Sequence, residues 1–175
     1  MYVIRPTQPL LRKLGIRPAT STAASTTALG DWFIRPHNVG RQRLLLCTSS
    51  KSLLTVLVPA RDLPAVGRRL RDAVGDLLFS LGASLEAVNR ELAAMGESVV
   101  AATNDRRILG SMTDMAHMAD AHLGDGASAG HLVVVGMKLA QAPCGPLGYD
   151  APVRVALALL QGTATPSPAP GEGAP

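Results

Sequence analysis

The residues best placed to do chemistry lie between Asn104 and Asp114, where charged and hydroxyl side chains are closely spaced. Ser111 and Asp114 have the spacing of a capping box, in which the hydroxyl accepts from a first-turn N–H and the carboxylate reaches back. A helix N-terminus with the nearby Arg106 and Arg107 would attract an anion, although Asp114 would itself occupy that positive end. The segment is therefore a candidate site for anion binding or for a small enzyme.

A second interpretation of this segment starts the helix earlier. Asp105 can cap a helix that begins at Arg106. Two cations would then lie in the first turn, against the helix dipole, at a cost of about 0.3–1 kcal/mol each. A purely structural explanation also exists, in which Arg106 and Arg107 pair with surface acids while Gly110 permits close packing. The sequence leaves these alternatives open.

The remaining reactive residues predict neither a metal site nor a bound cofactor. His117 and His122 follow Ser111, but the apolar stripe of that helix leaves His117 on the solvent side, and a metal needs three or four convergent ligands. Cys47 lies in an apolar strand and Cys144 in a Pro/Gly loop, so they form no disulfide framework. The glycines at 124–130 miss the dinucleotide fingerprint.

Positive charge is concentrated near the start of the chain. Residues 1–71 contain 12 Lys and Arg against 2 acids, whereas residues 72–175 contain 5 against 11. Arginine makes bidentate contacts with phosphate and carboxylate groups, so this half could contact nucleic acid, an acidic protein or the acidic half of the same chain. The candidate anion-binding residues are Arg35, Arg41, Arg43, Arg68, Arg69, Arg106, Arg107 and Ser111.

Length and composition indicate a soluble globular protein. The 175 residues are 47% apolar and 17% charged, which fits one packed domain and excludes wholesale disorder. No apolar run reaches the ~18 residues that span a bilayer, and Pro6 and Pro9 interrupt any signal-peptide core. We expect a cytoplasmic protein with no membrane contact, a domain over 1–161 with a mobile Ser/Thr loop at 18–28, and a disordered tail at 162–175.

Apolar spacing indicates where the strands and helices lie. Strands are expected at 2–5, 31–39, 43–48, 52–58 and 98–103, with Pro36 marking an edge strand and 43–58 forming a hairpin. Helices are expected at 8–14, at 63–81 after Asp62 as N-cap, after Ser84, after Ser111, at 132–141 and at 151–161 after Asp150 as N-cap. A flexible link is expected at 124–130, and 132–141 also fits a strand.

This order of elements predicts an α+β fold. The strands cluster near the start and the helices come later, which favours an antiparallel sheet of four or five strands with helices packed on one face.

Three segments resemble a bacterial family known as domain of unknown function 6933. They are Leu29-Gly30-Asp31-Trp32-Phe33, the pair 41–48 with 53–59, and Thr103-Asn104-Asp105-Arg106-Arg107-Ile108-Leu109-Gly110-Ser111-Met112. The likeness covers about residues 1–160 and is most specific in the last segment. The chain departs from the family at Arg107, where Ser is usual, and in its longer Ser/Thr loop at 20–27. The family has no established activity, so the resemblance implies no catalytic residues.

Three functional hypotheses follow. The first is a non-catalytic binding or regulatory module whose basic surface contacts an anionic partner such as nucleic acid. The second is a protein-interaction domain, including one that forms a homo-oligomer, with docking driven by the charge asymmetry. The third is a small enzyme centred on the segment from Asn104 to Asp114.

Overall fold

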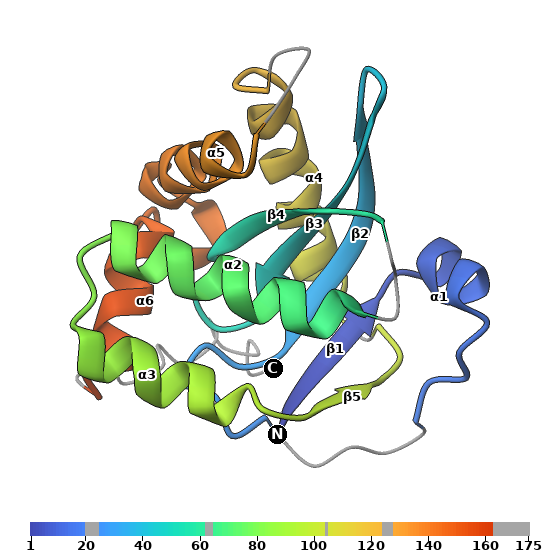
Figure 1. The fold of residues 1–175 in the computed structure, drawn as a ribbon. Coiled ribbons are helices and arrows are strands. Elements are labelled where there is room, and N and C mark those ends of the chain that lie inside the picture. The colour runs from blue at the N-terminus through green and yellow to red at the C-terminus, as the bar shows by residue number, and fades with distance from the viewer. Residues whose placement is uncertain (20–24, 62–64, 104, 124–127, 163–175) are drawn as a thin grey trace, which may run out of the picture.

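The computed structural model describes residues 1–19, 25–61, 65–103, 105–123 and 128–162. Strands and helices alternate irregularly along the chain, which confirms the α+β class (Figure 1). The strands are β1 (Tyr2–Pro6), β2 (Trp32–Val39), β3 (Gln42–Ser49), β4 (Thr55–Pro59) and β5 (Ser98–Val100). The helices are α1 (Gln8–Leu14), α2 (Val66–Ser80), α3 (Leu85–Ala94), α4 (Arg106–Asp120), α5 (Ala129–Gln141) and α6 (Pro152–Leu160), with a 3-10 turn η2 (Gly145–Leu147) before α6.

The five strands form one mixed sheet in the order β4-β3-β2-β1-β5. The pairs β2–β3 and β3–β4 are antiparallel, and the second of these is the hairpin expected at 43–58. Strand β1 is parallel to both of its neighbours, β2 and β5. The prediction of a purely antiparallel sheet is therefore wrong, because the two parallel pairings of β1 make the sheet mixed. Parallel neighbours need long crossovers, and residues 7–31, which contain α1, supply one between β1 and β2.

Helices cover both faces of the sheet rather than the one face that we expected. Trp32 and Ile34 of β2 belong to an apolar cluster that contains residues of α2, α3 and α6. Phe33, which points the opposite way, packs in a second cluster with residues of α4 and α5. Every residue from Leu44 to Cys47 is apolar and buried, which is typical of a strand covered on both sides.

Strand β2 lies in the middle of the sheet, so the prediction of an edge strand from Pro36 is wrong. The Thr7 N–H donates to the Ile34 carbonyl at 2.8 Å, so the polar groups of Ile34 face β1. Pro36 has the same parity, and β1 pairs with β2 only as far as Ile34. The backbone nitrogen of Pro36 therefore faces a side of β2 that has no paired strand at this position. The N–H that proline lacks costs no hydrogen bond there.

Most helix boundaries follow local signals. Helix α1 has the predicted bounds, with Pro9 in its first turn and Gly15 ending it at φ +64°. The Ser84 hydroxyl accepts from the Ala87 N–H at the start of α3, and residues 132–141 are helical. Asp150 lies one residue before the N-cap of α6, which is Ala151, so it does not cap that helix as predicted.

Several predictions fall on segments outside the described residues. These are the Asp62 cap, the centre of the Ser/Thr loop at 20–24, the link at 124–127 and the tail from 163 onwards. Within the part of the chain that is described, no helix combines the length and apolar character needed to cross a membrane.

Candidate functional site

The structure distributes the eight candidate anion-binding residues over different parts of the fold. Arg35 points toward α4, where its guanidinium donates to the Thr113 hydroxyl at 3.2 Å. Arg106, Arg107 and Ser111 lie on α4 itself. Arg43 points to the opposite side of the sheet, the side of α2, and α2 carries Arg68 and Arg69. Arg41 is exposed in the turn between β2 and β3. These residues therefore do not form one continuous surface.

The start of α4 settles the two interpretations of the segment from Asn104 to Asp114. The Asp105 carboxylate accepts from the N–H groups of Arg107 at 2.8 Å and Ile108 at 3.2 Å, so it is the N-cap. Ser111 is buried in the middle of the helix, where its hydroxyl donates to the Arg107 carbonyl. The capping box at Ser111 is therefore wrong, and Ser111 offers no hydroxyl to an anion.

The two arginines of the first turn of α4 differ in their surroundings. Both are exposed, and Arg107 donates to the Pro146 carbonyl at 2.8 Å, which ties α4 to η2. The Arg106 side chain has no hydrogen bond or ion pair with a described residue. Neither of the two best-defined cavities of the described structure is lined by residues 105–114. Neither of these two cavities therefore supports the hypothesis of an enzyme centred on this segment.

A different set of residues forms the larger of these two cavities, which has a volume of about 310 Å³. We call it the basic cavity, because Lys13 of α1 and Arg43 of β3 line it together with the Asn38 amide of β2. Its other lining residues are apolar: Leu10, Pro36, Leu44, Leu45 and Ala60.

Local structure explains why these polar groups converge. Asn38 and Arg43 are cross-strand partners in the β2–β3 hairpin, so their side chains leave the same face of the sheet. Leu10 is buried and holds α1 against the sheet. Lys13 follows Leu10 by three residues and therefore shares its face of the helix. A hairpin and a helix that are distant in the sequence thus place two cations and one amide around a single hollow.

The basic cavity carries uncompensated positive charge. Among the described residues, neither the Lys13 ammonium nor the Arg43 guanidinium makes a hydrogen bond or an ion pair, and no carboxylate lines the hollow. Two cations near low-dielectric walls raise the local concentration of anions. The arrangement can therefore bind an anion with the lysine, the guanidinium and the amide as donors.

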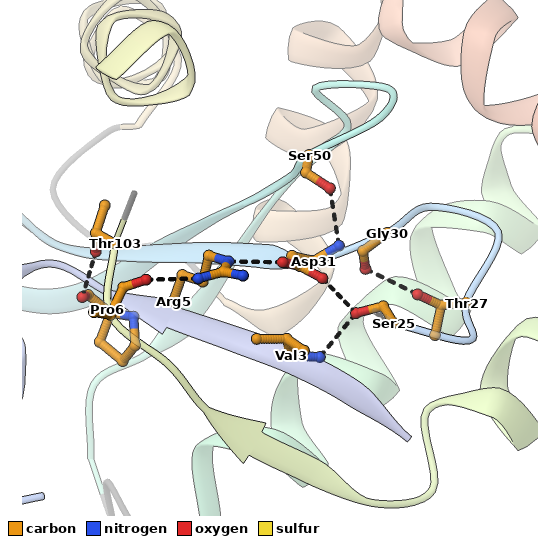
Figure 2. Close-up of polar contacts among 10 residues, drawn as sticks. Val3, Arg5, Pro6, Ser25, Thr27, Gly30, Asp31, Ser50 and Thr103 are labelled. Atoms are coloured by element: carbon orange, nitrogen blue, oxygen red, sulfur yellow. Dashed lines mark hydrogen bonds and ion pairs between the residues drawn. The ribbon is translucent and has the colours of Figure 1, made fainter. Parts of the chain in front are cut away.

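Arg5 shows how the fold neutralises another early arginine. Its Nε lies 2.6 Å from Asp31 Oδ2, and its Nη1 donates to the Ala102 carbonyl (Figure 2). Asp31 Oδ1 accepts from the Ser25 hydroxyl, which in turn accepts from the Val3 N–H. All of these groups are satisfied by one another, so this network fastens β1 and β2 together and is not open to a ligand.

Buried ionisable groups outside the cavity have shifted pKa values. Burial raises the pKa of the Glu91 carboxyl, although the Ala28 and Leu29 N–H groups donate to it and oppose the shift. Burial lowers the pKa of His37, despite Asp120 at 3.1 Å. Burial also raises the pKa of the Cys47 thiol, so this cysteine stays protonated and is a poor nucleophile. No three metal-ligating side chains of the described residues come together.

A model of a known protein family matches most of the chain. The model of a family described as domain of unknown function (DUF6933) matches residues 3–155. The chain belongs to this family. The matched region of DUF6933 runs from β1 into α6 and includes α1 and the β2–β3 hairpin, so it contains the whole basic cavity. Neither the curated proteins nor the solved structures include a match. The resemblance inferred from the sequence segments is thus confirmed.

Sequence reasoning found Arg43 but missed Lys13 and Asn38. Their contribution depends on a contact between α1 and the β2–β3 hairpin, which no local sequence pattern predicts. One partial signal was available: Lys13 follows Leu10 by three residues on a helix whose bounds the sequence predicted correctly.

Proposed function

We propose that this domain is a non-catalytic binding module that takes a phosphate-bearing partner, with single-stranded nucleic acid as the partner class, at the basic cavity. The observation that supports this proposal is the pairing of Lys13 and Arg43 around one hollow with no carboxylate in its lining. Lysine and arginine are the residues that contact phosphate in most nucleic-acid complexes.

The apolar part of the lining suits the rest of a nucleotide. Leu10, Pro36 and Leu45 offer apolar contact for a sugar or a base beside the two cations. A volume of about 310 Å³ lies at the lower end of the range of small-ligand pockets, ~300–1,000 Å³. The hollow therefore has room for one nucleotide unit, and a longer strand would continue across the surface.

Fluorescence anisotropy with a labelled oligothymidylate tests the proposal. We expect binding at low salt, and the double variant Lys13→Gln/Arg43→Gln should lower the slope of log affinity against log salt by about 1.4, or ~0.7 for each lost single-strand phosphate contact. The matched control Arg106→Gln/Arg107→Gln removes the same charge at α4 and should leave the slope closer to that of wild type. Absence of binding at low salt, or an effect confined to the α4 variant, overturns the proposal.

A second candidate function is protein interaction. Phe79 at the end of α2 and Leu85 at the start of α3, on either side of the turn that joins these helices, are 68% and 65% exposed, and exposed apolar patches mark contact surfaces. Sedimentation of wild type and of Phe79→Ser/Leu85→Ser tests self-association through this corner. A wild-type monomer at high concentration would remove the homo-oligomer version.

A further inference from the structure

A second hollow, of about 190 Å³, follows the free edge of the sheet. We call it the edge cleft. Its floor is Val56–Pro59 of β4, which is an edge strand. One wall is α2, which contributes Asp72 and Asp76, and the other is α5, which contributes Val133. Arg61 lies at the end where β4 finishes. Most ligand pockets have volumes of about 300–1,000 Å³, so the edge cleft suits only a small occupant.

The floor of the edge cleft offers backbone hydrogen bonds. Val58 lies opposite Leu45, and the Ala60 N–H donates to the Arg43 carbonyl, so the even-numbered residues of β4 bond to β3. Leu57 has the opposite parity, and its N–H and C=O therefore face the cleft. Neither group has a hydrogen-bond partner among the described residues. A ligand lying along this edge would find one donor and one acceptor in place.

One end of the cleft is closed. A Cβ atom placed on Gly136 of α5 would lie 3.3 Å from the Leu77 side chain of α2 and 3.4 Å from the Thr55 carbonyl of β4. Helices α2 and α5 therefore meet beside β4 at Thr55, and an extended strand cannot continue past this point. The cleft accepts a small molecule or the end of a chain, and not a strand that runs through it.

The charged groups of the cleft have two signs. Asp72 and Asp76 of α2 supply the negative charge, whereas Arg61 and Arg69, which lies one helical turn before Asp72, supply the positive charge. Asp76 lies one residue before Leu77, on the closed side, whereas Arg61 follows Pro59 on the open side. The side chains of Asp72, Asp76 and Arg61 have no hydrogen bond or ion pair with any described residue. An occupant that carries a cation at its inner end and an anion or a carbonyl toward the mouth would pair with both.

From these observations we propose that the edge cleft binds the α-amino end of an aliphatic residue, either as a free amino acid or as the first residue of a peptide. The ammonium group lies by Asp72 and Asp76, the aliphatic side chain contacts Val133 and the apolar floor, and the carboxylate or carbonyl faces Arg61 and the Leu57 N–H. This site is separate from the basic cavity and does not depend on the function proposed for it.

Calorimetric titration of the full chain with L-leucine tests the proposal. Saturable binding is expected, and Asp76→Asn should weaken it by about tenfold or more, because a lost hydrogen bond to a charged group is worth about that factor. The matched control Asp114→Asn, an exposed aspartate on α4, should change nothing. Because both residues are exposed, the two variants are expected to fold, which circular dichroism checks.

Three further probes separate the chemistry and the source of the ligand. 4-Methylpentanoate lacks the ammonium group and should bind at least about tenfold more weakly than L-leucine. The tripeptide Leu-Gly-Gly should bind more tightly than L-leucine if the natural ligand is a peptide terminus and more weakly if it is a free amino acid. Lys13→Gln/Arg43→Gln should leave leucine binding unchanged. The proposal is overturned if neither L-leucine nor the tripeptide binds, if 4-methylpentanoate binds as tightly as leucine, or if Asp76→Asn has no effect.

Discussion

Nε of Arg5 lies 2.6 Å from Oδ2 of Asp31, and this pair joins the end of β1 to the residue that precedes β2. Both side chains are largely buried, with 14% and 19% exposed. The Asp31 N–H also donates to the Ser50 hydroxyl, and its Oδ1 binds Ser25 (Figure 2). A single aspartate thus connects β1, the loop before β2 and the β3–β4 turn.

Asp31→Asn should lower the free energy of unfolding by about 2 kcal/mol, because it removes charged hydrogen bonds and leaves Arg5 without its counter-charge. Urea unfolding measures the change. Glu86→Gln is the matched control, because Glu86 pairs with Arg90 at 3.5 Å on an exposed helix face and should cost at most ~0.5 kcal/mol. Equal effects of the two substitutions would show that the network of Asp31 adds nothing to stability.

Gly30 is expected to be the least replaceable glycine next to this network. Its φ is +82°, and a Cβ atom there would collide with Ser50 Oγ, the acceptor for the Asp31 N–H. Gly30→Ala should cost ~1–2 kcal/mol of left-handed strain plus about 1–3 kcal/mol for the collision. Gly148→Ala isolates the strain, because Gly148 has φ +66° and open space around it. If thermal unfolding shows equal losses for both variants, the close approach of Ser50 has no energetic role.

Glu91 should make the stability depend on pH. Its pKa in the folded protein is raised above the ordinary 4.5 by burial, so the folded state holds a proton that the unfolded chain releases. The stability contributed by the protonated carboxyl is therefore complete below pH 4.5 and is lost as the pH rises through the folded pKa. Urea unfolding of wild type and Glu91→Gln across this range should show wild type losing stability relative to the variant. If the stability of wild type relative to Glu91→Gln stayed constant or increased with pH, this prediction would be contradicted.

Tyr149 occupies a strained position that it does not need for packing. Its φ is +64° and the residue is 80% exposed. Tyr149→Gly should raise the free energy of unfolding by up to about 1 kcal/mol, since glycine adopts this conformation without the penalty. Tyr149→Ala keeps the strain and should give no gain. Should the glycine variant be less stable than wild type in thermal unfolding, the tyrosine side chain must make a stabilising contact.

Local patterns predicted the elements that depend on neighbouring residues. Helix α1 has the expected bounds because Pro9 and Gly15 act within a few residues of its ends. The start of α4 was ambiguous because Asp105 and Ser111 are both good caps, and only tertiary packing decides which residues begin the helix. Ser111 is buried in a helix that contacts β2 and β3, and this packing is a long-range event that no local signal encodes.

The arrangement of the sheet was less predictable than its strands. Pro36 suggested an edge strand, but the side of β2 that it faces is left unpaired by the length of β1. The basic cavity shows the same limit. The sequence indicated an excess of early cations, yet only the fold shows that Arg5 is neutralised by Asp31 whereas Lys13 and Arg43 share one hollow.

The most direct test of the basic cavity is a ¹H–¹⁵N NMR titration with a 5′-phosphorylated dinucleotide. We expect the largest shifts at the Asn38 side-chain amide, at Arg43 Nε–H and at the backbone around Lys13, because these groups line the hollow. The cavity would be rejected as the binding site if the spectrum does not change, or if the largest shifts fall at Arg106 and Arg107 on α4.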